Sequence, residues 1–235
     1  MTAMKIEVLA DAGAVAEAAA RFIAADARAA VAERGRYVFA VSGGTTPWVM
    51  LRALARQDVP WHAVHLLQVD ERVAPAGDPV RNLTHLHESL REHAPLAAAR
   101  IHAMPVEAAD LDAAAARYAL LLRELTGSPA VLDLVHLGLG PDGHTASLVP
   151  GDPVLDVSAV DVALITGMYQ GTRRMTLTYP ALDRARRVLW LVTGAEKVGM
   201  LARLQAGDRS IPAGRVRADH ALVLADRAAA PQPDN

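Results

Sequence analysis

Hydrophobic and polar residues along the chain form two kinds of segment that alternate. Short apolar runs bounded by Gly, Pro, Asp or Ser predict buried strands, at residues 6–9, 37–41, 64–69, 131–137, 162–166, 175–178, 188–193 and 221–224. Longer stretches, in which charged residues interrupt alanine and leucine at helical spacing, predict amphipathic helices, at residues 12–33, 47–56, 83–93, 111–125 and 195–205.

This alternation predicts the fold class. Parallel strands need long crossover connections, and helices in those connections cover both faces of the sheet. We therefore expect an α/β protein with a mostly parallel open sheet, helices on both faces and a modified Rossmann-like topology. The 235 residues contain no internal repeat and no long linker. We expect a single domain over residues 1–235, with its core at about 5–226 and a flexible tail at 227–235 that is frayed from 231 onward.

Composition and charge narrow the possible functions. A net charge of −2 gives no general attraction to nucleic acid or to a membrane, so any anion site must be local. No segment reaches the ~18 uninterrupted apolar residues of a membrane span, and the first residues lack the apolar core of a signal peptide. We therefore expect a cytoplasmic protein. The absence of Cys excludes disulfides, thiolate metal sites and a Cys nucleophile.

A glycine-rich loop follows the apolar run at 131–137. Residues 138–151 read Gly-Leu-Gly-Pro-Asp-Gly-His-Thr-Ala-Ser-Leu-Val-Pro-Gly and carry Asp142 and His144 on either side of a glycine. Ligands of open α/β sheets bind beyond the carboxyl ends of strands, and a neutral imidazole can take a proton from water near neutral pH. We interpret His144 as a general base. The alternative is a capping or core histidine, but Thr145 and Ser147 are available to cap the next helix in its place.

Two other chemistries are compatible with parts of the sequence but are not favoured. Gly138, Gly140 and Gly143 have the dinucleotide spacing G-x-G-x-x-G, and Asp161 lies about twenty positions further on. However, the loop is in mid-chain, and the carboxylate of Asp142 would repel a pyrophosphate. The other histidines show no spacing that joins three metal ligands. We therefore expect neither a metal nor an organic cofactor.

Two further loops supply polar residues at the same predicted edge of the sheet. Residues 42–47, Ser-Gly-Gly-Thr-Thr-Pro, lead into a helix, and their backbone N–H groups, hydroxyls and the helix dipole favour an anion. A plain capped turn is the alternative. Asp70, Glu71 and Arg72 directly follow a strand and are expected outside the core; Arg72 could stabilise an oxyanion and Asp70 could hold a sugar hydroxyl. The alternative for the charged triplet is a solvated ion pair, and the alternative for Asn82 is a plain N-cap.

Together these motifs resemble the glucosamine-6-phosphate isomerase/6-phosphogluconolactonase family. The resemblance covers about residues 5–226 and is carried, in order, by the segments at 42–47, 69–73, Asn82, 137–148, 174–178 (Arg-Met-Thr-Leu-Thr), 191–197 (Leu-Val-Thr-Gly-Ala-Glu-Lys) and 211–213. It implies one α/β domain, a small sugar phosphate as the partner, and no required metal or cofactor. We expect the protein to be a monomer or a weak homo-oligomer.

The lactonase branch of that family implies hydrolysis of 6-phospho-D-glucono-1,5-lactone to 6-phosphogluconate, in the oxidative pentose phosphate pathway. By this resemblance His144 activates water, Arg72 steadies the oxyanion, and Asp70 and Asp142 orient substrate and imidazole. The residues expected to hold the phosphate are Ser42, Gly43, Gly44, Thr45, Arg174 and Lys197.

Two alternatives remain at this point. The deaminase branch usually continues after its His with Ile-Ala-Phe-Asn-Glu-Pro, whereas residues 145–150 here contain no carboxylate. The second alternative is a sugar-phosphate sensor without catalytic activity. The chain also departs from the usual lactonase pattern at Arg81, where Ser is common, and at Val149, where Phe is common.

Overall fold

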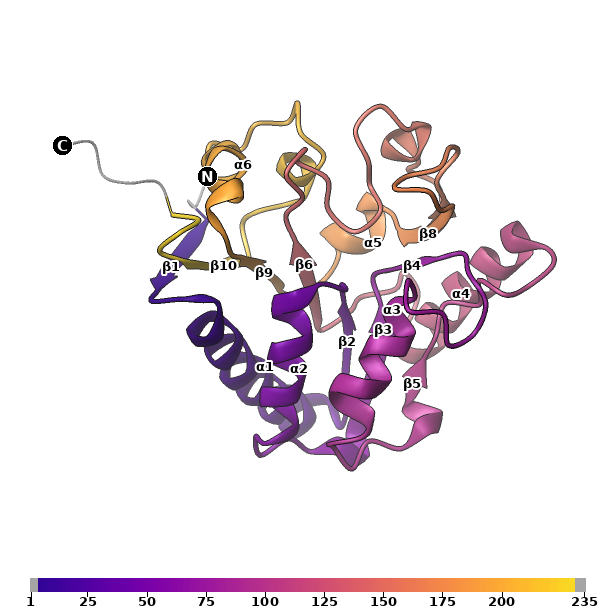
Figure 1. Cartoon of the computed structure of the whole chain (residues 1–235). Helices are drawn as coiled ribbons and strands as arrows, with labels where there is room; N and C mark the ends of the chain where they lie inside the picture. Colours follow the sequence, from indigo (N-terminus) through magenta and orange to yellow (C-terminus); the bar gives the residue numbers. More distant parts are fainter. Residues whose placement is uncertain (1–3, 231–235) are drawn as a thin grey trace.

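The computed structural model describes residues 4–230, and the tail predicted at 231–235 lies outside the described residues. Its centre is a sheet of seven parallel strands in the order β1-β10-β9-β6-β2-β3-β5 (Figure 1). The strands are β1 Lys5–Leu9, β2 Tyr37–Val41, β3 Val64–Gln68, β5 Ile101–His102, β6 Leu134–Gly138, β9 Val188–Val192 and β10 Ala221–Asp226.

Helices cover both faces of this sheet. The α-helices are α1 Ala12–Arg34, α2 Thr45–Ala55, α3 Asn82–Leu86, α4 Leu111–Thr126, α5 Tyr179–Asp183 and α6 Val198–Gln205. Figure 1 shows α1 and α2 in front of the sheet and α4 on its other side. Tyr37, Phe39 and Val41 of β2 pack with α1 and α2, while the alternate residues Val38 and Ala40 pack with α4. The predicted fold class is therefore confirmed.

Short helical turns complete the connections. The 3-10 turns are η1 Trp61–Ala63, η3 Ala98–Arg100, η4 Pro153–Asp156, η5 Ala195–Lys197 and η6 Ala213–Arg215, and η2 His87–Arg91 is a π-turn. The helix predicted at 83–93 is thus divided between α3 and η2, and the helix predicted at 195–205 begins as η5. None of the helices within residues 4–230 is long and apolar enough to cross a bilayer.

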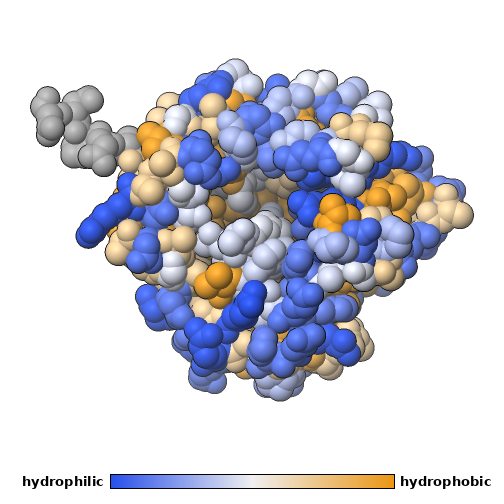
Figure 2. Space-filling view, viewed as in Figure 1, coloured by the Kyte–Doolittle hydropathy of each residue, from blue (hydrophilic) through white to orange (hydrophobic). Residues whose placement is uncertain are grey.

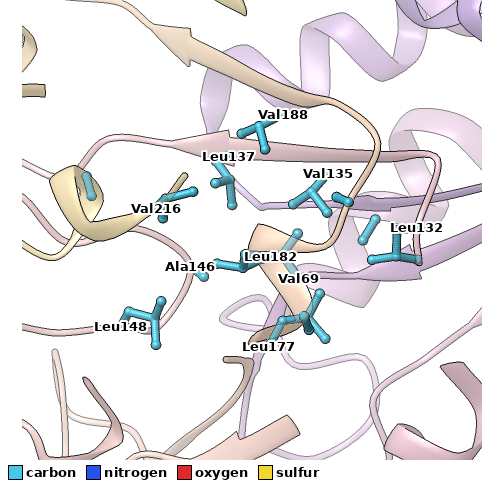
Figure 3. Packing of buried hydrophobic residues seen from close by; sticks show 14 of the residues in the cluster. Val69, Leu132, Val135, Leu137, Ala146, Leu148, Leu177, Leu182, Val188 and Val216 are labelled. Atoms are coloured by element: carbon cyan, nitrogen blue, oxygen red, sulfur yellow. The ribbon is translucent and has the colours of Figure 1, made fainter. Parts of the chain in front are cut away.

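A second, smaller sheet is antiparallel and was not predicted. It consists of β4 Asp70–Arg72, β8 Arg174–Leu177 and β7 Val162–Leu164, in the order β4-β8-β7. Its apolar side chains join the core of the main sheet: Figure 3 shows Leu177 of β8, and Val69 just before β4, near Leu182 in the cluster that also holds Val135. The sheet pairs the charged triplet at 70–72 with Arg174, Met175 and Thr176 of β8.

The structure shows where two predicted segments, one strand and the tail, begin. The strand predicted at 131–137 begins only at Leu134, because the Asp133 side chain accepts the N–H of Val38 at 2.8 Å instead of facing the core. Residues 227–230 belong to the predicted tail. The N–H of Arg227 donates to the carbonyl of Leu9, and Ala229 is fully buried, so this part of the tail packs against the sheet.

The strand order creates a crevice between β2 and β6. From β2 the chain continues to β3 on one side, whereas β6 pairs with the other side of β2. The connections that leave the carboxyl ends of these two strands diverge, and such a switch point is where open α/β sheets bind ligands. The loops at 42–44 and 138–144 both start there.

Candidate active site

A pocket of about 340 Å³ lies at this switch point. Figure 2 shows the face of the molecule hollowed near its middle, above the start of α2. The volume suits a small polar ligand. All of the predicted site residues except Asp142 line the pocket, namely Ser42, Gly43, Gly44, Thr45, Asp70, Arg72, His144, Arg174 and Lys197; Asn82, Thr46, Thr193 and Glu196 line it as well.

One end of the pocket is formed by the start of α2. Gly44 is the N-cap with φ +134°, and no side chain caps the helix. The first N–H groups of a helix have no intrahelical acceptor, so they remain available to an anion. The hydroxyls of Thr46 and Thr193 are 2.8 Å apart and tie this helix start to the loop after β9. That loop carries Lys197, which forms no ion pair within the described part of the chain.

Ser42 has a different place from the one predicted. Its N–H donates to Nδ1 of His136 at 3.2 Å, and its hydroxyl donates to the carbonyl of His136 at 3.1 Å. The N–H and the hydroxyl of Ser42 are therefore both directed toward the protein interior. The donors available to an anion are those of residues 43–46. Burial lowers the pKa of His136 to about 3, so this histidine is neutral. The sequence shows His136 only as one polar residue in an apolar run.

His144 lies at the other end of the pocket, and its ring is bonded to Asp142, which lies outside the pocket lining. Asp142 Oδ1 lies 2.5 Å from His144 Nδ1, which is too close for two lone pairs, so Nδ1 carries a proton and donates it. Among the hydrogen bonds within residues 4–230, none involves Nε2, the nitrogen on the opposite side of the ring. Gly140 makes room for the ring, since a Cβ there would lie 1.9 Å from Nδ1.

The carboxylate of Asp142 stays ionised beside the imidazole. Partial burial raises its pKa, but the hydrogen bonds from the His144 ring, the His144 N–H and the Tyr169 hydroxyl outweigh burial and lower the pKa overall. The helix expected after this loop is absent: residues 145–148 form a turn. Thr145 donates to the carbonyl of Gly138 at 2.9 Å, and Ser147 donates to Asp70 at 2.7 Å.

Asp70 and Glu71 are buried, which contradicts the expectation that the charged triplet lies outside the core. The Glu71 carboxylate accepts the N–H groups of Asn82 and Leu83 at 2.8 and 2.9 Å and pairs with Arg81 Nε at 3.1 Å. It is thus the cap of α3, and Asn82 is the first residue of that helix rather than its N-cap. Arg81, the residue that departs from the usual pattern, is buried as the partner of Glu71.

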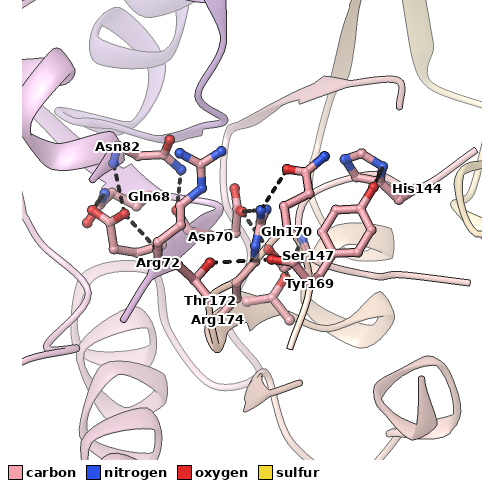
Figure 4. A network of polar contacts seen from close by, with 12 residues as sticks. Gln68, Asp70, Arg72, Asn82, His144, Ser147, Tyr169, Gln170, Thr172 and Arg174 are labelled. Carbon is pink, nitrogen blue, oxygen red and sulfur yellow. Dashed lines mark hydrogen bonds and ion pairs between the residues drawn. The ribbon is translucent and has the colours of Figure 1, made fainter. Parts of the chain in front are cut away.

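Arg72 and Arg174 approach the pocket from β4 and β8. Arg72 donates to the carbonyl of Val80 at 2.7 Å, and Arg174 lies 3.9 Å from Asp70 (Figure 4). Each has a buried Nε with no hydrogen-bond partner in residues 4–230. Burial lowers the pKa of Arg174, and the charge of Asp70 opposes that shift.

Two residues of the β7–β8 hairpin belong to the site, although their positions gave no signal in the sequence. Tyr169 contacts both Asp142 and His144, and Gln170 accepts a hydrogen bond from Arg174 Nη2 at 3.0 Å. Their partners are 4 to 27 residues away along the chain. The hairpin formed by β7 and β8 packs its tip against the loop after β6, and this long-range packing brings Tyr169 to Asp142 and His144.

These features define a class: an open α/β protein whose pocket has an uncapped helix start at one end and, at the other, a histidine bonded to an aspartate. Residues 10–224 match the family described as glucosamine-6-phosphate isomerases/6-phosphogluconolactonase, and the chain belongs to that family. The resemblance drawn from the motifs is confirmed.

Relatives of known activity agree over nearly the whole length. The chain is 37% identical to 6-phosphogluconolactonase of Mycobacterium tuberculosis over 96% of both chains, and 37% identical to that of Synechocystis sp. over 83% of both. The crystal structure of 6-phosphogluconolactonase from Thermotoga maritima has a TM-score of 0.84 and 27% identity, covering 94% of this chain and 98% of that one.

Proposed function

We propose that this protein hydrolyses 6-phospho-D-glucono-1,5-lactone to 6-phosphogluconate. Its family and the activity named for its relatives support this function. The observation that carries it is a single pocket with an open helix start at one end and, at the other, an imidazole whose Nδ1 is held by a carboxylate. The first end suits a phosphate, and the second suits activation of water.

The reaction follows from the protonation of His144. With Nδ1–H bonded to Asp142, Nε2 has the free lone pair and takes a proton from water as the water oxygen attacks the lactone carbonyl. The carbonyl oxygen becomes an oxyanion, and the adjacent guanidinium of Arg72 stabilises it. The bond to the ring oxygen then breaks, and the imidazolium returns its proton to that oxygen. Atoms and charge balance without any other reactant.

The other predicted residues have supporting roles in this proposal. The N–H groups of residues 43–46 and the ammonium of Lys197 hold the phosphate. Arg174 adds a second cation, and Asp70 orients it from 3.9 Å while Ser147 holds Asp70. Ser42 shapes the loop, because its own donors bind His136. No metal or organic cofactor takes part.

The proposal also includes the setting of the enzyme. We place the protein in the cytoplasm, in the oxidative pentose phosphate pathway, because the charge of a sugar phosphate keeps it from crossing a membrane. Its partner is the small sugar phosphate alone, without nucleic acid or membrane. We propose a monomer or a weak homo-oligomer.

The test is the rate of 6-phosphogluconate formation at early times, with spontaneous hydrolysis subtracted. We expect activity in the wild type and a loss of ~100-fold or more in kcat for His144→Ala. His62→Ala, an exposed histidine outside the pocket, is the matched control and should behave as wild type. Ammonia release from glucosamine 6-phosphate would instead show a deaminase. Binding of the sugar phosphate without turnover would show a sensor.

A further inference from the structure

The hairpin between β7 and β8 brings a tyrosine against the Asp142–His144 pair. Its tip is a turn at Gln170 and Gly171 with φ +50° and +80°, closed by a bridge between Tyr169 and Thr172. The rings of Tyr169 and His144 meet edge-on, with centroids 5.1 Å apart. Figure 4 shows the Tyr169 hydroxyl beside the imidazole. The turn thus fixes where the hydroxyl points.

The direction of the Tyr169 hydrogen bond follows from its neighbours. The hydroxyl lies 2.9 Å from Asp142 Oδ2 and 3.1 Å from His144 Nδ1. Because Nδ1 already carries the proton shared with Asp142 Oδ1, it has no lone pair to offer, so the hydroxyl donates to Oδ2. Asp142 therefore accepts three hydrogen bonds: from the His144 ring, from the His144 N–H at 3.1 Å and from Tyr169.

The phenol remains a donor at every pH at which the enzyme would work. Burial and the bond to Asp142 raise the pKa of Tyr169 to about 12. The same ring supports a second group of the site: the guanidinium carbon of Arg174 lies 4.9 Å from its centroid, a cation–π distance. Tyr169 thus connects the proposed base with the proposed phosphate-binding cation.

We propose that Tyr169 is a positioning residue that acts through both of its parts. Its hydroxyl orients the Asp142 carboxylate and takes up part of that carboxylate's charge, which leaves less of it to stabilise the His144 imidazolium. Its ring keeps Arg174 facing the pocket. The inference rests on the proposed function, because it assigns these two effects to proton transfer and to substrate binding respectively.

Other charged groups near His144 keep their surroundings in Tyr169→Phe, because the ring that contacts Arg174 is retained. Those that line the same pocket are Asp70 and Arg72 from β4, Arg174 from β8, and Glu196 and Lys197 from η5. Asp142 belongs to the loop of His144 itself. A change in the titration of His144 on removal of the phenol oxygen therefore reports the bond between Tyr169 and Asp142.

Two substitutions separate the two parts of Tyr169. Tyr169→Phe keeps the ring and removes the donor, so kcat near pH 7 should fall about threefold to tenfold while KM stays the same. The acidic limb of the pH profile of kcat/KM should move up by about 0.5 to 1 pH unit, because the full charge of Asp142 then stabilises the imidazolium. Tyr169→Leu also removes the ring, and it should raise KM about fivefold or more in addition, through Arg174.

A control and a second measurement make the outcome decisive. Met168→Ala shortens a neighbouring side chain that is 70% exposed on the same hairpin, and it should match the wild type. NMR titration of the His144 imidazole in the protein without substrate should show the upward pKa shift in Tyr169→Phe. An active wild type with unchanged kcat, pH profile and His144 titration in Tyr169→Phe would overturn this inference and leave the proposed function standing. An inactive wild type would overturn the proposed function, while the NMR shift would still establish the coupling.

Discussion

Two glycines of the pocket matter because a polar group occupies the space where their side chains would be. A Cβ on Gly43 would lie 2.0 Å from Asn82 Oδ1, and a Cβ on Gly140 would lie 1.9 Å from His144 Nδ1. Neither glycine has a positive φ, so close approach rather than backbone conformation demands them. At this scale, the imidazole is aligned with Asp142 partly because residue 140 has no side chain.

Replacing Gly140 by Ala tests that alignment. The added methyl group must displace the ring from its bond to Asp142, so we expect kcat to fall by about tenfold or more. The comparison is Gly199→Ala in α6, where a Cβ meets nothing within 4 Å and kcat should be unchanged. Full kcat in Gly140→Ala would show that the observed position of the imidazole is not the one used in the reaction.

Among the individual residues, those in local motifs could be predicted and those paired over long range could not. His144 follows its carboxylate by two positions, so the sequence displays the pair. Glu71 has its partners on α3 and Tyr169 has its partners on another loop. Glu71 can be buried because Arg81, about ten positions further along the chain, is buried beside it. No spacing pattern in the sequence predicts such an ion pair.

At the scale of the element, α3 depends on a carboxylate from β4. Glu71 is completely buried and accepts hydrogen bonds from Gln68, Arg72, Asn82 and Leu83, besides the ion pair with Arg81. The carboxylate thus joins the small sheet to the start of a helix. The charge of Glu71 is paired and its hydrogen bonds are formed only while β4 and α3 stay in contact.

Removal of this carboxylate should therefore be costly. Glu71→Ala removes the buried partner of Arg81, leaves that guanidinium only the exposed Glu107 at 2.9 Å, and leaves the N–H groups of Asn82 and Leu83 without their acceptor. We expect the free energy of unfolding in urea to fall by about 3–5 kcal/mol. Glu88→Ala, which breaks the ion pair of an exposed glutamate with His85, should cost less than about 1 kcal/mol. Equal losses in the two variants would mean that the Glu71 network adds nothing beyond an exposed pair.

In the proposed function, the start of α2 and Lys197 at the start of α6 bind the phosphate together. Lys197→Ala should weaken the substrate and inorganic phosphate by the same factor, about tenfold or more, because a charge-assisted bond to the same anion is lost in both. KM and the inhibition constant of phosphate measure the two effects. Lys5→Ala, on the edge strand β1, serves as the control. A change in kcat alone would contradict the assignment.

Among the elements, the long helices and the strands of the main sheet other than β5 follow from periodicity alone, because each buries one regular face or a whole apolar run. β5 is only two residues long, too short to show a pattern, and was not predicted. β4 could not be predicted in this way, because three consecutive charged residues are not typical of a strand. Its pairing with β8 covers about a hundred intervening residues.

For the molecule as a whole, buried histidines make stability depend on pH. Burial lowers the pKa of His136 to about 3 and also lowers the pKa of His65, His87 and His102, whereas an unfolded histidine titrates near 6.5. Between these values the unfolded chain binds protons that the folded chain excludes. The stabilisation is therefore complete above about pH 6.5 and is lost progressively as the pH falls toward the folded-state values.

We expect His136 alone to contribute a slope of up to about 1.4 kcal/mol per pH unit in this window. Urea unfolding at about pH 7 and about pH 5 measures the slope, above the range in which ordinary carboxyl groups titrate. His136→Gln, whose amide oxygen can accept the Ser42 N–H, should reduce the slope by the contribution of one proton. The same slope in both proteins would exclude His136 as its source.

The edge of the main sheet links the two ends of the chain. β1 joins the sheet only through β10, and Asp226 at the end of β10 accepts the N–H of Gly194, which precedes Lys197. During synthesis β1 therefore has no strand to pair with until β10 has been made. A nascent chain that stops before β10 leaves β1 undocked and the turn before Lys197 unsupported, so we expect such a chain to be unable to bind the substrate.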